Sequence, residues 1–166
     1  HLRRQETEAS TDLGETWRFL SMGAHASAEG SETALLEVSP GRILAHTRNE
    51  AATLLDRWSD DDGKTWSHPL LTSILGYPPH LLKLRDGRIL CSYGYRRDPM
   101  GIRAVLSEDG GRSWGEPIVL RDDGGTPSSL RPDASGGGSD VGYPLSTQLS
   151  DGSILTVYYI TVEDGI

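Results

Sequence analysis

The sequence predicts an all-β protein built from repeated four-stranded antiparallel units. An octapeptide with the pattern Ser-x-Asp-x-Gly-x-(Thr/Ser)-Trp occurs three times, as STDLGETW, SDDDGKTW and SEDGGRSW. Its central aspartates, Asp12, Asp61 and Asp109, are spaced 49 and 48 residues apart. A motif that recurs at such an interval indicates a repeated structural unit rather than a catalytic motif used once. No segment shows a helical period of apolar residues, which also favours strands.

A tight polar turn also recurs, each time before an apolar run, in SPGRIL (39–44), RDGRIL (85–90) and SDGSIL (150–155). β-rich segments lie on both sides of each turn, which is typical of a hairpin. In each complete unit a third β-rich segment precedes the octapeptide, and a fourth follows it. The order strand A, turn, strand B, loop, strand C, octapeptide, strand D defines a blade, and radial arrays of such blades form β-propellers.

Taken in order along the chain, the elements form a single propeller segment over residues 1–166. We expect strands C and D of one blade at 3–21, complete blades at 31–73 and 77–121, a long loop at 122–142, and strands A and B of a last blade at 143–162. Three blades' worth of strands is too few for a closed propeller. Either the chain is part of a longer propeller, or two copies complete each other's half blades and close a six-bladed ring as a homodimer.

The octapeptide is expected to be structural. Its Asp can accept hydrogen bonds from nearby backbone N–H groups, its Gly can adopt a positive φ, and its Trp can pack between strands or blades. The residues with these roles are Asp12, Trp17, Asp61, Trp66, Asp109 and Trp114. The alternative, Ca²⁺ binding by Asp60, Asp61 and Asp62, lacks the alternating ligands and closing Glu of an EF-hand loop. We expect no metal and no cofactor.

Composition excludes several classes of partner. A net charge of −8 argues against nucleic acid or an anionic membrane surface as the main partner. No apolar run approaches the roughly 18 residues of a membrane span. Cys91 is the single cysteine, so no intrachain disulfide forms. This composition fits a secreted or periplasmic glycan-active protein.

The octapeptide resembles the Asp-box of sialidases and other proteins with bacterial neuraminidase repeats. HLLKLRDGRILCSYGYR, GIRAVLSEDGGRSW and DVGYPLSTQLSDGSILTVYY further resemble a sialidase-like subgroup. The resemblance covers nearly the whole chain and about half of a full propeller. It implies a β-propeller that acts on or binds acidic glycans, as an exo-α-sialidase type of glycoside hydrolase. Asp-boxes also occur in polysaccharide lyases, other glycosidases and propellers without catalytic activity, because a fold does not determine a function.

The resemblance places the binding face on the B–C and D–A loops, at the opposite end from the Asp-boxes. A sialidase holds the carboxylate of its sugar with guanidinium groups, whose planar fork bonds both oxygens. Arg48, Arg96 and Arg103 are the candidates for substrate binding. Arg97 and Arg131 are interpreted as solvated loop residues.

The resemblance also implies a tyrosine nucleophile activated by a carboxylate, with an aspartate as acid/base. Tyr95, Tyr143 and Asp140 are the catalytic candidates, and Glu50 and Asp98 are further carboxylates. An Asp that caps a turn and a Tyr that packs are the structural alternatives. The family's arginine in a Phe-Arg-Ile-Pro type stretch and its early acid/base aspartate are absent, and both would belong to an N-terminal half.

His80 allows a different chemistry. A uronate polysaccharide lyase abstracts a proton beside a carboxylate and needs a His or Tyr base together with a neutralising residue. His80 with Tyr95 and Arg96 would suit that reaction, although a histidine near the start of a strand also serves simply as a hydrogen-bonded residue. A propeller that binds glycans or proteins without turnover is the remaining alternative.

Overall fold

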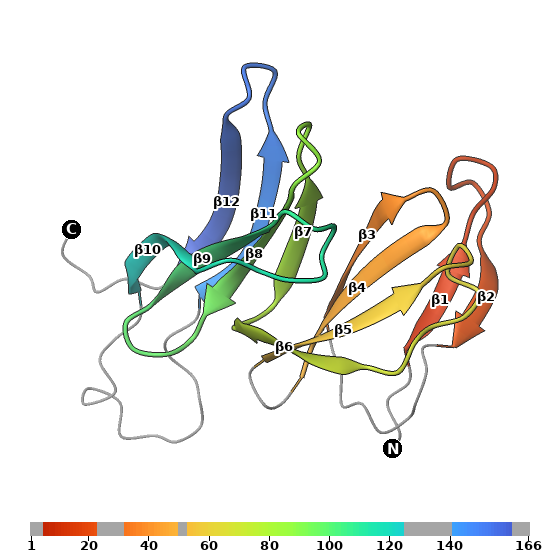
Figure 1. The fold of residues 1–166 in the computed structure, drawn as a ribbon, viewed down its shortest axis with the longest axis horizontal. Coiled ribbons are helices and arrows are strands. Elements are labelled where there is room, and N and C mark those ends of the chain that lie inside the picture. Colours follow the sequence, from red (N-terminus) through yellow and green to blue (C-terminus); the bar gives the residue numbers. More distant parts are fainter. Residues whose placement is uncertain (1–4, 23–31, 50–52, 125–140, 161–166) are drawn as a thin grey trace.

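The computed structural model describes residues 5–22, 32–49, 53–124 and 141–160, and every regular element in them is a β-strand (Figure 1). The two complete sheets consist of β3 (Thr33–Ser39), β4 (Arg42–Arg48), β5 (Thr53–Ser59) and β6 (Leu70–Leu75), and of β7 (Pro79–Lys83), β8 (Ile89–Tyr95), β9 (Met100–Ser107) and β10 (Ile118–Gly124). The two short sheets consist of β1 (Glu6–Ala9) with β2 (Arg18–Met22), and of β11 (Val141–Gln148) with β12 (Ile154–Ile160). Among the described residues no helix is long and apolar enough to cross a membrane.

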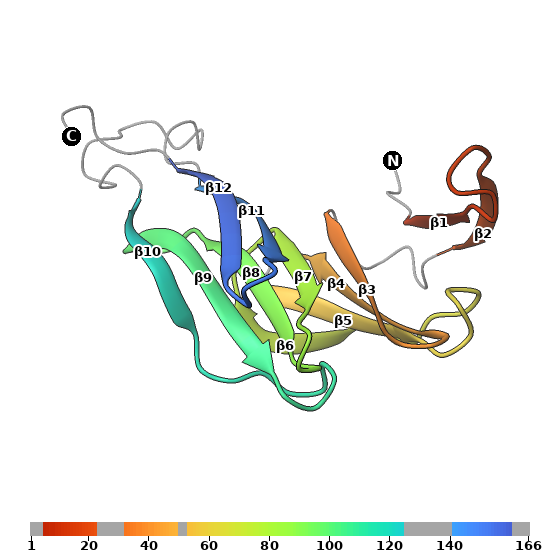
Figure 2. The ribbon, with the colours of Figure 1, turned by 90° about the horizontal axis from the view of Figure 1, so that it is seen from above.

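Consecutive strands pair antiparallel within each sheet, as expected for propeller blades. The first strands of successive sheets lie next to one another, since β7 contacts β3 and β11 contacts β7. Figures 1 and 2 show the sheets succeeding one another in chain order, with β1 and β2 at one end and β11 and β12 at the other. The predicted fold class is therefore confirmed: two full β-propeller blades with two complementary half blades.

The core lies between the two complete blades. Leu44 and Leu54 from the first blade pack against Ile89, Tyr93 and their neighbours from the second, and all of them are almost fully buried. Strand β8 is buried along nearly its whole length because sheets cover both of its faces. This explains its continuous apolar sequence, ILCSYGY, in place of an alternating one.

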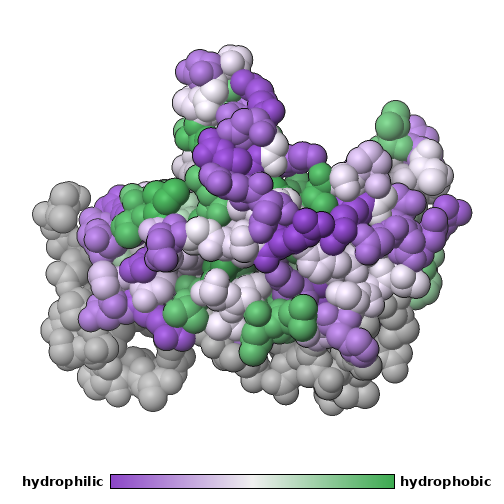
Figure 3. Space-filling model, viewed as in Figure 1, coloured by the Kyte–Doolittle hydropathy of each residue, from purple (hydrophilic) through white to green (hydrophobic). Residues whose placement is uncertain are grey.

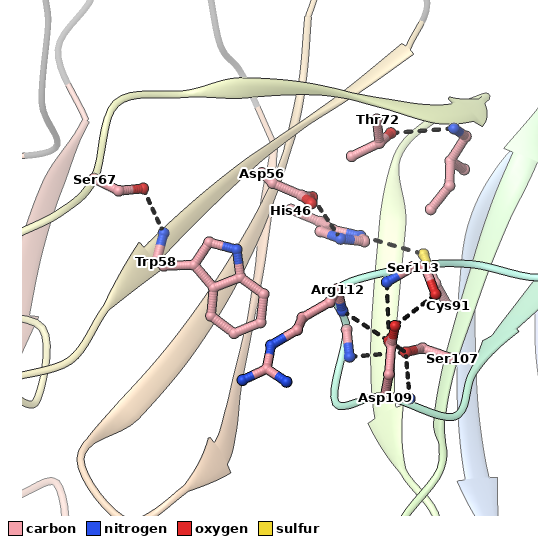
Figure 4. A network of polar contacts seen from close by, with 12 residues as sticks. His46, Asp56, Trp58, Ser67, Thr72, Cys91, Ser107, Asp109, Arg112 and Ser113 are labelled. Carbon is pink, nitrogen blue, oxygen red and sulfur yellow. Dashed lines mark hydrogen bonds and ion pairs between the residues drawn. The ribbon is translucent and has the colours of Figure 1, made fainter.

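A polar contact also joins the two blades (Figure 4). His46 on β4 is fully buried, with its Nε2 atom 2.8 Å from the Asp56 carboxylate on β5 and its Nδ1 atom 3.5 Å from the Cys91 sulfur on β8. These His46 and Asp56 atoms lie close together without the alignment of a hydrogen bond. Burial raises the pKa of the Cys91 thiol, which is therefore neutral and not a nucleophile.

The three octapeptide turns share one pattern of hydrogen bonds. In the second, Ser59 Oγ donates to Asp61 Oδ1 at 2.8 Å, and Gly63 N donates to Ser59 Oγ at 2.8 Å. Thr65 donates to the Asp61 carboxylate from its backbone N at 2.8 Å and from its hydroxyl at 2.6 Å. The same contacts recur around Asp12 and, as Figure 4 shows, around Asp109. Among the described residues no cluster of His, Cys, Asp or Glu is arranged to hold a metal ion.

The three tryptophans of these turns have different surroundings. Trp114 packs against the core, with its ring 5.0 Å from that of His46. Trp66 Nε1 donates to Ser21 Oγ at 3.3 Å, which ties the second turn to β2. Trp17 is 63% exposed. Only in the two complete blades, therefore, is the ring at least partly covered by a neighbouring sheet.

These turns should make the stability of the fold decrease at acidic pH. Hydrogen bonds from Thr16, Thr65 and Ser113 lower the pKa of Asp12, Asp61 and Asp109 to about 2. Because a carboxyl of the unfolded chain titrates near about 3.9, the ionised turns stabilise the fold above that pH and lose this contribution as the pH falls toward 2. We expect the melting temperature to fall between about pH 4 and pH 2.

Thermal melts of Asp61→Asn should show a lower melting temperature at neutral pH and a shallower fall in acid. Asp60→Asn is the matched control, since Asp60 lies in the same turn but contacts Arg42 instead of the turn itself. Identical acid profiles for Asp61→Asn and the unchanged chain would contradict this prediction.

The two half blades present unpaired edges within the described part of the chain. β12 pairs only with β11, and β1 pairs only with β2. Leu145, Leu155 and Val157 are each more than half exposed on the sheet of β11 and β12, and Figure 3 shows apolar surface among hydrophilic residues on the side that it draws. Unpaired edges of this kind associate with other strands.

The homodimer in which two copies complete each other's half blades stays a prediction. Light scattering on a sizing column should then give twice the 18.0 kDa mass of the chain. A monomer at micromolar concentration would exclude this arrangement.

Candidate active site

Five side chains from both complete blades and the last half blade gather at the end of the sheets opposite the octapeptide turns. They are Glu32, Arg48, Tyr77, Arg96 and Tyr143. Each lies where a strand begins or ends: before β3, at the end of β4, before β7, after β8 and at the start of β11. The antiparallel order of the blades places all five positions at the same end.

Tyr143 and Glu32 form the centre of this cluster. The Tyr143 hydroxyl donates a hydrogen bond to Glu32 Oε1 at 2.7 Å. This bond raises the pKa of Tyr143, while the nearby Arg96 and Arg48 act in the opposite direction. Tyr143 is 48% exposed and has a positive φ of 51°, which is uncommon for a residue with a side chain. Its ring stacks on that of Tyr159, with centroids 5.7 Å apart.

Arg48 is held by the same carboxylate. Its Nη1 lies 3.0 and 3.3 Å from the two Glu32 oxygens, and its backbone N donates to the Glu32 carbonyl at 2.9 Å. Glu32 therefore contacts both a guanidinium and a phenol. As the acceptor of the hydrogen bond from the Tyr143 hydroxyl, the Glu32 carboxylate is placed to take the tyrosine proton.

Arg96 approaches from the other complete blade. Its Nε donates to the Val141 carbonyl at 3.0 Å, and its guanidinium carbon lies 5.2 Å from the centre of the Tyr77 ring. Arg48 lies over the same ring at 4.1 Å. The two arginines are thus neighbours, although they come from different sheets.

Glycines allow the backbone segments of the cluster to meet. A Cβ atom on Gly94 would lie 2.8 Å from the Tyr77 carbonyl oxygen and 2.9 Å from the Cα of Gly142. Gly142 has a φ of 151°, and a Cβ there would lie 3.4 Å from Arg96 Nη2. No side chain fits at Gly94 without moving the backbone that carries Tyr77 and Tyr143.

The structure places the other residues predicted from the sequence elsewhere. Arg103 lies 3.5 Å over the ring of Tyr95, and its buried Nε has no hydrogen-bond partner. His80 is half buried on β7, where its Nδ1 accepts a hydrogen bond from Ser146 N at 3.2 Å and burial lowers its pKa. Arg97 is exposed. Asp140, Glu50 and Arg131 lie outside the described residues.

Sequence reasoning missed Glu32 and Tyr77. The structure pairs Thr33 with Thr47, which sets Glu32 beside Arg48, but the register shifts between Glu37 and Ser39, so counting back from the hairpin turn at 39–42 misses this neighbour by one residue. No local signal exists for Tyr77 either, since its partners come from two different blades.

Comparison with known proteins identifies the family of the chain. A family described as BNR repeat-like domain matches residues 3–156. The chain belongs to this family. The resemblance seen in the sequence is thereby confirmed, and the BNR repeat-like fold accounts for the regular spacing of the octapeptides. A search among curated proteins found no match.

Several solved structures resemble this BNR repeat-like chain. A Dyadobacter fermentans protein of unknown function is 33% identical with a TM-score of 0.79, over 95% of this chain and 42% of that one. A variant of the NanB sialidase from Streptococcus pneumoniae is 21% identical, with a TM-score of 0.65 over 93% and 24% of the two chains. An α-L-arabinanase from Penicillium chrysogenum is 18% identical, with a TM-score of 0.60 over 92% and 48%.

The last two likenesses show the fold alone, at identities this low. The chain spans less than half the length of each of these three proteins. Together the family and its structural neighbours show a BNR repeat-like β-propeller.

Proposed function

We propose that this chain carries part of the active site of a sialidase-type glycoside hydrolase acting on acidic glycans. The observation that carries the proposal is the Tyr143 hydroxyl donating to Glu32 Oε1 at 2.7 Å, beside Arg48 and Arg96. A phenol, a carboxylate and two guanidinium groups within one cluster combine a nucleophile, its base and an anion-binding pair.

The arginines would bind the carboxylate of the sugar. A guanidinium donates from a rigid planar fork that matches carboxylate geometry, and such charge-assisted hydrogen bonds are among the strongest in proteins. Two guanidinium groups beside one carboxylate, Glu32, leave the cluster with an excess positive charge. This local charge supports binding of an anionic sugar by a chain whose net charge is −8.

Tyr143 would then be the nucleophile. Its oxygen attacks the anomeric carbon, its proton passes to Glu32, and the bond to the leaving group breaks as that group takes a proton from an acid. Water then attacks the anomeric carbon and gives its proton to the conjugate base of that acid, while the bond to the Tyr143 oxygen breaks and the proton on Glu32 returns to Tyr143. The leaving-group acid is a second residue, and Asp140, proposed for this role from the sequence, lies outside the described residues.

The products of the reaction test the proposal against its alternatives. A sialoside incubated with the protein should release free sialic acid. A uronate lyase would instead create an unsaturated product that absorbs in the ultraviolet, and a binding module would show saturable affinity without turnover. Either of those results would replace the hydrolase assignment.

A further inference from the structure

One aromatic ring contacts two arginines at the proposed site. The ring centre of Tyr77 lies 4.1 Å from the guanidinium carbon of Arg48 and 5.2 Å from that of Arg96. The other described arginine–ring contacts pair a single arginine with a single ring, as Arg103 with Tyr95 does. Tyr77 lies in the connection between the two complete blades, and each blade supplies one of its arginines.

The backbone beneath this ring is held in place. Tyr77 N donates to the Gly94 carbonyl at 2.8 Å. Its own carbonyl lies so close to Gly94 that a Cβ there would approach it to 2.8 Å, and Pro78 Cδ would lie 3.3 Å from a Cβ on Gly142. The main chain that carries the ring is therefore fixed between two neighbouring segments, and the ring itself packs against the core.

An aromatic ring suits the electrostatics of the cluster, because two guanidinium groups repel each other. Arg48 is also held by the Glu32 carboxylate, and Arg96 by the Val141 carbonyl. The face of an aromatic ring is negative and attracts cations, and this attraction strengthens where water is partly excluded. Tyr77 is half buried, so its face offsets part of the repulsion.

We propose that Tyr77 is a positioning residue that holds Arg48 and Arg96 together as one carboxylate-binding pair. This inference rests on the proposed function, which assigns those arginines to the sugar carboxylate. A guanidinium donates in its own plane, so anchoring both groups on one ring limits the directions of their N–H donors. The pair is thereby ordered in advance, which lowers the entropy cost of binding an anion. A neutral sugar has no carboxylate, so its affinity does not depend on this arginine pair.

Substitutions at position 77 distinguish the effect of the ring face from the effects of the hydroxyl and of side-chain volume. Tyr77→Phe keeps the face and removes the hydroxyl, while Tyr77→Leu keeps apolar volume and removes the face. Pentafluorophenylalanine at the same position keeps the ring shape but removes the negative character of its face. Titrations would use N-acetylneuraminic acid and its methyl ester, which differ in the carboxylate charge.

The unchanged chain should prefer the acid over the ester. This preference should persist in Tyr77→Phe and fall about tenfold or more with leucine or pentafluorophenylalanine, the loss expected for two cation–π contacts. Affinity for the ester should stay the same in all variants. The inference would be overturned if every variant preferred the acid over the ester equally, or if Tyr77→Phe lost as much of this preference as Tyr77→Leu.

A second measurement needs no ligand. In protein labelled with ¹⁵N-arginine, the Nε–Hε signals of Arg48 and Arg96 should shift in Tyr77→Leu and stay in place in Tyr77→Phe. Arg103, on the ring of Tyr95, is the internal control and should not move. If the unchanged chain binds neither acid nor ester, the proposed function fails, and the arginine signals alone decide the role of Tyr77. Signals that do not move in Tyr77→Leu would overturn it.

Discussion

Tyr143→Phe should lower the turnover of a sialoside by about a thousandfold or more and leave its KM nearly unchanged. The substitution removes only the oxygen that would attack the anomeric carbon, and losing a nucleophile that acts in the chemical step lowers kcat by orders of magnitude. The phenylalanine ring can still stack on Tyr159, as the tyrosine does at 5.7 Å. Substrate binding by Arg48 and Arg96 should therefore survive.

Two further variants sharpen this experiment. Glu32→Gln should also lower kcat, because an amide cannot accept the tyrosine proton that the carboxylate now faces at 2.7 Å. Tyr95→Phe is the matched control, since Tyr95 lies under Arg103 and is not one of the five clustered side chains. Loss of turnover in Tyr95→Phe with full activity in Tyr143→Phe would assign the nucleophile to the other tyrosine and contradict the proposed site.

Asp56→Ala should destabilise the fold by about 2 kcal/mol, within the range for a buried polar group that loses its partner. The variant leaves the fully buried His46 without the carboxylate that lies 2.8 Å from its Nε2. Since His46 also contacts Cys91 and Trp114 on the neighbouring blade, the change should weaken the contact between blades. Urea unfolding followed by tryptophan fluorescence would measure it.

Arg42→Ala provides the comparison for this effect. Arg42 also forms an ion pair, at 3.5 Å to Asp60, but its side chain is 36% exposed and that of Asp60 is 73% exposed. We expect a change in the free energy of unfolding below about 1 kcal/mol, as for other surface pairs. Equal losses in the free energy of unfolding for Asp56→Ala and Arg42→Ala would show that the buried contact contributes no more than the pair of Arg42 and Asp60. A leucine pair at 46 and 56 should recover part of the stability lost in Asp56→Ala.

The blades could be predicted from the sequence because their determinants are local. Each octapeptide turn is closed by hydrogen bonds between residues two to four positions apart, such as Ser59 to Asp61 and Thr65 to Asp61. The polar hairpin turns also depend on residues close in sequence, and β-rich runs indicate the strands between them. Repetition then revealed the blade and, with it, which loops share an end of the sheets.

The cluster at the candidate active site depends on contacts between distant residues, which no local sequence pattern predicts. Arg48, Arg96 and Tyr143 could be proposed because strand order put their loops on one face. Choosing among the arginines and tyrosines required the packing of three blades, which brings Tyr143 to Glu32 across 111 positions of sequence and sets Arg103 on Tyr95 instead.

The sequence by itself determined the repeated unit and the number of strands, since turn chemistry and hydrophobic periodicity act between near neighbours. The face on which chemistry was sought came from the resemblance to a known family. Only the tertiary structure decided which side chains meet on that face. Their contacts are set by how one blade packs on the next, at glycine crossings such as Gly94 against Tyr77 and Gly142. Such packing is a property of segments far apart in the chain, so it appears only when they are placed together in space.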